Sequence, residues 1–236
     1  MSTRRGPELP YKVVAGVTPW GSRWVVASAK MHAATFAPEQ PKIYSSFIDV
    51  LDERPSFSVI VVNAPVGYIE KSSEEVRTCD RQGRAILARR GAGLHNAPTR
   101  IMLEEGAHPS EGRVDAVTAM LLPRYREVAK EMSPYRQRVV YEGKPELSFY
   151  QLNNEMPLRF SKKIEAGREE RRMLLEKKIP GIDKVIYSDI PGVPRKHLYD
   201  VGALLYTARR VFGHAAIRIP SEAEWDSEGL RMELVL

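Results

Sequence analysis

The stretch YKVVAGVTPWGSRWVVASAKM, residues 11–31, decides the fold. Residues 11–18 are rich in Val and Ala, which is typical of a buried strand, and residues 23–31 have a similar composition. Between them, Pro19, Trp20 and Gly21 predict a turn. We therefore predict two antiparallel strands joined as a hairpin.

Strands and helices alternate after this hairpin. A third short strand is expected near Ile43 to Phe47, and a brief helical segment should stop before Pro55. The β-branched run Val59 to Val62 predicts a central strand. Further helices are expected over residues 73–90, 113–132, 146–152, 167–178 and 196–212. Pro123 is a possible point of interruption in the second of these, and Pro145 can start the third. Further strands are expected over residues 138–142, 216–219 and 230–236. This order predicts an α/β fold in which an antiparallel three-strand meander and parallel strands form one mixed sheet, with helices on both faces and ligands at the strand ends.

The bulk properties predict a single soluble domain over residues 1–236 with a flexible arm at residues 1–10. A chain of 236 residues with 43% hydrophobic content can bury a substantial core. Its formal net charge of +6 favours anionic partners such as nucleic acid without demonstrating them. The single cysteine, Cys79, excludes an internal disulfide and favours the cytoplasm. No apolar run reaches the roughly 20 residues that a membrane span requires.

Five segments together resemble one known family. They are residues 15–27, Asn63 to Gly67, Arg77 to Asp80, Glu142 to Phe149, and the helical segment around Asp200. In that order, they are similar to five features of domain of unknown function family 429. Residues 15–27 resemble its opening hairpin, Asn63 to Gly67 its Asp-x-Pro-x-Gly strand end, and Arg77 to Asp80 its Arg-x-Cys-Asp helix. Glu142 to Phe149 resemble its Glu-x-x-Pro-Glu-x-Ser-Phe segment, and the segment around Asp200 resembles its last long helix. That family consists of bacterial and archaeal predicted nucleases, so the resemblance implies a ribonuclease-H-like fold.

The resemblance also implies a metal site. In ribonuclease-H-like folds, carboxylates at the end of the first strand, on the neighbouring central strand and on a late helix hold Mg or Mn, which need several oxygen ligands. Here the first two positions are Thr18 and Asn63, whose side chains are neutral. We therefore expect a degenerate site with weak, single-metal or no activity. The remaining acids are Asp200 and Glu142, expected as metal ligands, Glu146, expected with them as a catalytic residue, and Asp80 as a further candidate.

Each acid also has a structural interpretation. Asp200 lies among apolar residues on a predicted helix, where a charge is costly to bury unless something pairs with it. It is therefore either a site residue or a structural residue bonded to an arginine or a backbone amide. Glu146 follows Pro145 and fits equally a first-turn acid, which contributes roughly 0.3 to 1 kcal/mol through the helix dipole.

Two groups of cations are candidate phosphate contacts. Arg77, Arg81 and Arg84 are spaced i, i+4 and i+7, so they share one face of a helix, and guanidinium groups bind phosphate through paired hydrogen bonds. A solvated face is the alternative. Lys162 and Lys163 are candidates because of the family resemblance, although paired lysines are common on any surface.

Three functions remain open on this sequence. The first is a metal-dependent phosphodiesterase acting on nucleic acid or a nucleotide. The second is a non-catalytic module that binds nucleic acid or a protein partner. The third is a nucleotide-phosphate binder of the actin-like type, for which the first hairpin offers Gly16, Thr18, Gly21 and Ser22. The sequence contains no zinc-ligand spacing and no P-loop motif.

Overall fold

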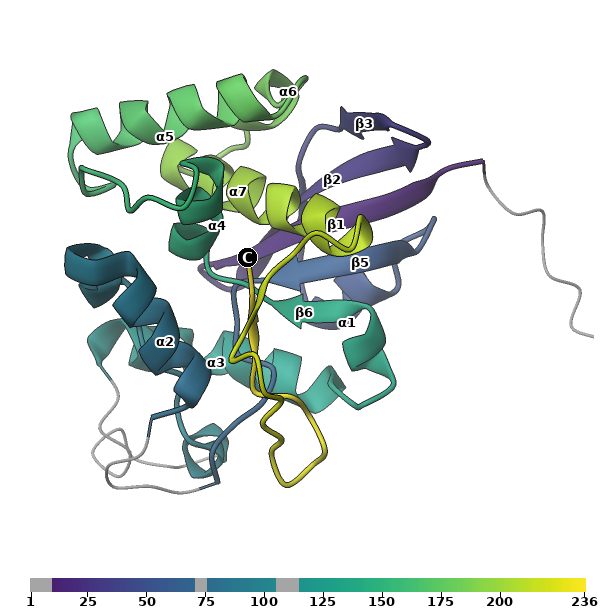
Figure 1. Cartoon of the computed structure of the whole chain (residues 1–236). Helices are drawn as coiled ribbons and strands as arrows, with labels where there is room; N and C mark the ends of the chain where they lie inside the picture. The colour runs from purple at the N-terminus through teal and green to yellow at the C-terminus, as the bar shows by residue number, and fades with distance from the viewer. Residues whose placement is uncertain (1–9, 71–75, 105–114) are drawn as a thin grey trace, which may run out of the picture.

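The structure is a computed structural model that describes residues 10–70, 76–104 and 115–236 (Figure 1). Nearly all of the predicted arm at residues 1–10, and the predicted starts of helices at residues 73 and 113, lie outside these ranges. Among the described residues, no helix combines the length and the apolar character needed to cross a membrane.

The central sheet is mixed. Strand β1 (Lys12–Trp20) pairs antiparallel with β2 (Arg23–His32), which pairs antiparallel with β3 (Thr35–Pro38). On its other side β1 pairs parallel with β5 (Phe57–Val62), and β5 pairs parallel with β6 (Val140–Glu142). The strand order is thus β3-β2-β1-β5-β6. This arrangement confirms the predicted mixed sheet, in which an antiparallel meander and parallel strands combine.

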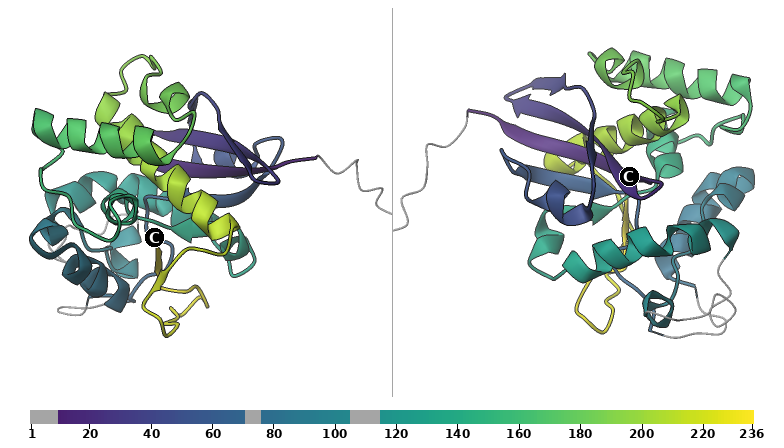
Figure 2. Two further views of the ribbon diagram at one scale, coloured as in Figure 1. Left: turned by 45° about the horizontal axis from the view of Figure 1, so that its top comes forward. Right: turned by 180° about the vertical axis from the view of Figure 1, so that it is seen from behind.

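Helices cover both faces of the sheet (Figures 1 and 2). The long helix α7 packs on β1, β2 and β5, and further helices pack on α7 in turn. On the opposite face, buried side chains of α1 and α3 join the core beneath the sheet. The bounds are α1 Phe47–Leu51, α2 Thr78–Leu87, α3 Ala116–Glu131, α4 Pro145–Leu152, α5 Glu165–Lys178, α6 Asp183–Ile186 and α7 Arg195–Phe212. A small sheet of β7 (Arg218–Ile219) and β8 (Leu234–Val235) lies beside α2.

A glycine in β1 sets the distance between the sheet and α7. A Cβ atom built on Gly16 would lie 2.4 Å from the backbone nitrogen of Leu205 and 2.6 Å from the carbonyl oxygen of Val201. Real Cβ atoms do not tolerate such contacts with backbone, so only glycine fits here. The backbone of α7 is therefore pressed directly onto β1.

Several boundaries differ from the sequence-based expectation. The predicted third strand near residues 43–47 is β4 (Lys42–Tyr44), which pairs with β2, and the preceding strand β3 was missed. The turn between β2 and β3 contains Ala33 with φ of 49°, a conformation that Gly or Asn usually signals. Helix α3 continues through Pro123 without interruption. The terminal strand is only two residues long, because the preceding segment is irregular.

Candidate functional site at the carboxyl edge of the sheet

Strands β1, β5 and β6 run parallel, so their carboxyl ends meet at one edge of the sheet. Thr18 lies near the end of β1, and Asn63 follows β5 directly. The backbone N–H of Asn63 donates to the carbonyl of Val17 at 2.8 Å. Its side-chain Nδ2 donates to Oγ1 of Thr18 at 3.4 Å. The two positions at which the resemblance implies acids are thus joined by a neutral hydrogen bond.

The edge has two faces, and the predicted ligands divide between them. Thr18 follows Gly16 by two residues, so it faces the same side of the sheet as Gly16, toward α7. Glu142 is in register with Val62, whose side chain belongs to the core on the α1 and α3 side. Residues in register on neighbouring strands share a face. Glu142 therefore points away from the α7 side that carries Asp200.

Glu142 is enclosed by hydrogen-bond donors. Its oxygens accept from Nη1 of Arg77 at 2.8 Å and from Nη2 at 2.7 Å, and Nζ of Lys144 lies 3.0 Å away. The backbone N–H of Val66 donates to it at 3.0 Å. Arg77 also donates to Asp80 through Nε and Nη2, both at 2.9 Å. All four charged side chains are buried. We call Arg77, Asp80, Glu142 and Lys144 the Arg77 cluster.

The formal charges of the Arg77 cluster balance, because two cations face two carboxylates. Burial alone raises the pKa of Asp80, but the charge and hydrogen bonds of Arg77 outweigh burial and hold that pKa below its usual value. Burial likewise lowers the pKa of Lys144, yet the charge of Glu142 leads the opposing effects that raise it overall. The buried thiol of Cys79, next in sequence to Asp80, has its pKa raised to about 12, chiefly by burial. This cluster is a closed structural network.

Asp200 occupies a second cluster on the α7 side. It is 5% exposed, and its Oδ2 accepts from Nζ of Lys162 at 2.8 Å. The same ammonium lies 3.6 Å from Oε1 of Glu146, whose Oε2 accepts from Nη2 of the buried Arg171 at 2.7 Å. Burial lowers the pKa of Lys162, but the charges of Asp200 and Glu146 raise it overall. We call Lys162, Asp200, Glu146 and Arg171 the Lys162 cluster.

The residues at this edge do not fit a divalent metal. Of the acids expected as ligands, Asp200 is bound by an ammonium, and Glu142 lies on the other face, bound by Arg77. Thr18 and Asn63 offer only neutral oxygens. Within the described ranges, no group of three His, Cys, Asp or Glu side chains is placed to hold a metal ion. Mg²⁺ and Mn²⁺ favour hard, charged oxygen ligands, and here the nearest carboxylate already has a cation.

The predicted phosphate contacts also separate. Arg77 is 3% exposed and points inward, whereas Arg81 is exposed and donates to Oγ1 of Thr78 at 3.2 Å. Arg84 bonds to the side chain of Asn96. Lys162 binds Asp200, while Lys163 is exposed. The three arginines therefore do not act as one solvent-facing row.

Sequence reasoning missed Lys144 and Arg171 as partners of the acids. It named Arg77 and Lys162, but as phosphate contacts. Lys144 lies two residues after Glu142 and was available as a pairing candidate by proximity. Arg171 had a weaker indication, because it stands on the inward side of α5 between Gly167 and Leu175, where an arginine is unusual. The pairing of Lys162 with Asp200 spans 38 residues, and no local pattern indicates it.

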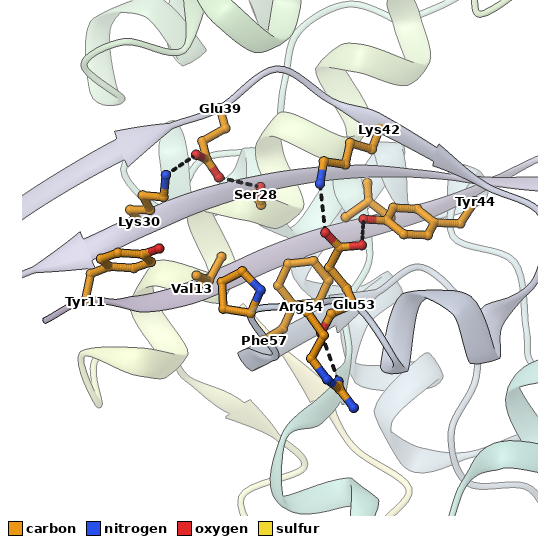
Figure 3. A pocket seen from close by; sticks show the side chains of 12 residues that line it. Tyr11, Val13, Ser28, Lys30, Glu39, Lys42, Tyr44, Glu53, Arg54 and Phe57 are labelled. Carbon is orange, nitrogen blue, oxygen red and sulfur yellow. Dashed lines mark hydrogen bonds and ion pairs between the residues drawn. The ribbon is translucent and has the colours of Figure 1, made fainter. Parts of the chain in front are cut away.

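A cavity of about 190 Å³ lies elsewhere, near the amino ends of β1 and β5 (Figure 3). Four of its charged groups form two ion pairs: Nζ of Lys30 lies 2.8 Å from Oε1 of Glu39, and Nζ of Lys42 lies 2.7 Å from Oε1 of Glu53. Arg54 donates to the backbone carbonyl of Glu53 at 3.1 Å. The cavity is therefore separate from the carboxyl edge and shares no residue with either cluster.

The family comparison agrees with the sequence resemblance. No curated protein matches the chain. Among solved structures, one described as "Thermus thermophilus RuvC structure" is similar, with 12% sequence identity and a TM-score of 0.38, over 86% of this chain and 97% of that one. The pattern of the family described as "Protein of unknown function (DUF429)" matches residues 16–225, most of the chain. The protein therefore belongs to the DUF429 family.

Proposed function

We propose that this protein binds nucleic acid at the carboxyl edge of its sheet and does not hydrolyse it by a two-metal mechanism. One observation carries the proposal: each acid expected at a metal site is already held by a cation of the chain. Lys162 holds Asp200, Arg77 holds Glu142, and Arg171 holds Glu146. A two-metal mechanism needs several free carboxylates, so its ligand set is missing.

Neutralising these acids also removes repulsion toward phosphate. A free carboxylate at the edge would repel a polyanion, whereas an acid paired with lysine or arginine adds no net charge. The +6 net charge of the chain then attracts nucleic acid without opposition from the edge. The same neutral pairs thus disfavour hydrolysis and favour binding.

Cations surround a half-buried aromatic ring at this edge, and the ring also packs on the core beneath α7. Trp20 ends β1, and the guanidinium carbon of Arg23 lies 4.9 Å from its ring centroid. The loop before α7 packs on the same ring, because a Cβ at Gly192 would lie 3.2 Å from Trp20. Basic surfaces with an aromatic side chain suit single-stranded nucleic acid, where phosphates pair with cations and bases stack. We define the edge surface as Trp20 together with the exposed cations Arg23, Lys163, Arg195 and Lys196, of which Arg195 lies over the Tyr187 ring at 5.7 Å.

The test is fluorescence anisotropy with labelled single-stranded DNA and RNA of mixed sequence. We expect binding that weakens steeply with salt, as counterion release requires. The double variant Arg195→Glu/Lys196→Glu should weaken binding by roughly tenfold or more and lower the salt slope by about one for each phosphate that the variant no longer binds. Arg54→Glu/Lys130→Glu is the matched control, because it changes the same charge at exposed positions just before β5 and in the last turn of α3, which packs on the opposite face of the sheet.

Two results would contradict the proposal. Binding that is absent, independent of salt, or weakened equally by both double variants would contradict a nucleic-acid interface at this edge. Cleavage of the oligonucleotide that requires Mg²⁺ or Mn²⁺ and disappears in Asp200→Asn would instead support a metal-dependent nuclease. Adding ATP as competitor distinguishes the actin-like alternative, since a nucleotide-phosphate site should be blocked by it.

A further inference from the structure

One oxygen of Asp200 has no partner. Oδ2 accepts from Lys162, but Oδ1 is buried and accepts no hydrogen bond from any described group. A buried carboxylate oxygen without a donor is costly, because it has lost its hydration. In the Arg77 cluster, by contrast, each oxygen of Glu142 is bonded. Asp200 therefore retains unused capacity to bind a cation.

Asp200 lies in the part of α7 that packs on the carboxyl end of β1. Helix α7 presses Val201 onto Gly16, and Thr18 lies two residues further along the same face of β1. The start of α7 lies at that end of β1, since Gly192, just before the helix, contacts Trp20. Helical side chains tilt toward the helix amino terminus, so the side chain of Asp200 is inclined toward the end of β1 that carries Thr18.

We infer that the Lys162 ammonium serves as a built-in cation at this edge, in the position where carboxylates at residues 18 and 63 together with Asp200 would hold a divalent metal. The inference rests on the proposed function in that both require wild-type protein to bind no metal here. It adds that two features exclude the metal: the neutral side chains of Thr18 and Asn63, and the ammonium itself. Restoring the acids alone should then be insufficient.

The formal charges at this site predict which variants should bind a divalent metal. Thr18, Asn63, Asp200 and Lys162 sum to zero in the wild type. Thr18→Asp/Asn63→Asp supplies three carboxylates, but the ammonium still occupies one of them and repels a second cation. Lys162→Met then removes that charge while keeping a long apolar stem. The triple variant has three carboxylates and no internal cation, a set that suits Mg²⁺ or Mn²⁺.

The experiment measures Mn²⁺ binding by the electron paramagnetic resonance signal of free Mn²⁺, together with thermal unfolding. We expect no binding by the wild type or by the double variant. The triple variant should bind Mn²⁺, and its Tm should rise by roughly 5 to 10 °C at about 100 times Kd. Lys163→Met in place of Lys162→Met is the matched control and should leave the double variant unable to bind.

The outcomes separate the two proposals. Binding by the wild type, lost in Asp200→Asn, would overturn the proposed function. Binding by the double variant with Lys162 present, or no binding by a folded triple variant, would overturn the built-in cation and leave nucleic-acid binding untouched. If the triple variant does not fold, a second pair decides: Lys162→Met should lower the Tm, and Lys162→Met/Asp200→Asn should recover most of the loss. No loss, or no recovery, would overturn the inference.

Discussion

Replacing Arg77 by Met should destabilise the protein severely, without a direct effect on phosphate binding. The side chain donates twice to Asp80, twice to Glu142 and once to the carbonyl of Gly67 at 2.7 Å. Its removal leaves two buried carboxylates with one remaining cation, Lys144. Breaking a buried ion pair by removing one partner costs about 3 to 5 kcal/mol. For a chain of this length, that cost corresponds to a decrease in Tm of roughly 6 to 20 °C.

The assay is thermal and urea unfolding of Arg77→Met beside Arg81→Met. Arg81 is exposed one turn further along α2, so its replacement should change stability by no more than about 0.5 kcal/mol. Arg77→Met/Glu142→Gln should recover part of the stability, because it removes one unpaired charge. A decrease in Tm below about 2 °C for Arg77→Met, with weaker nucleic-acid binding, would refute the structural role and support a direct role in binding phosphate instead.

Two further predictions concern packing and pH. Gly16→Ala should lower the free energy of unfolding by about 1 to 3 kcal/mol or more, because the new methyl group meets the backbone of α7. Gly93→Ala is the control and should be nearly neutral, because a Cβ there has no atom within 4 Å. Urea unfolding of both variants tests this, and equal effects would contradict the close packing of α7. Asp80 has a lowered pKa in the folded protein, so the unfolded chain binds its proton first, and the stability it contributes should be lost as the pH falls from about 5 toward 2. Asp80→Asn should flatten the stability curve in that window, and an unchanged slope would show that other acids govern it.

The regular elements were largely predictable from local pattern. The β-branched strands β1 and β5 and the apolar helix α7 each bury several consecutive or periodic side chains, and these patterns are visible along the chain. The family match over residues 16–225 confirms the resemblance. Strand β3 was missed because its four residues carry no strong alternation. The fold class could therefore be predicted, because each pattern on which it depends lies within a single segment of the sequence.

The partners of the acids were not predictable in the same way. Asp200 and Lys162 come from segments far apart in the chain, as do Glu142 and Arg77. Only the three-dimensional structure shows that Glu142 faces away from Asp200, although the register with Val62 decides it. Whether an acid binds a metal or an arginine depends on these contacts. Residues 18 and 63 were identified from the sequence, and the structure shows that their neutral side chains meet.

The two buried clusters also affect how the molecule behaves at a distance. Each contains two cations and two anions, so each has no net formal charge and adds little to the electrostatic potential at long range. The whole formal excess of +6 therefore lies on other residues. The screening length grows from about 8 Å at physiological salt to about 30 Å at 0.01 M, so at low salt this excess steers a polyanion before the two molecules touch. A substitution that exposed one unpaired charge would change the encounter rate, even from beneath the surface.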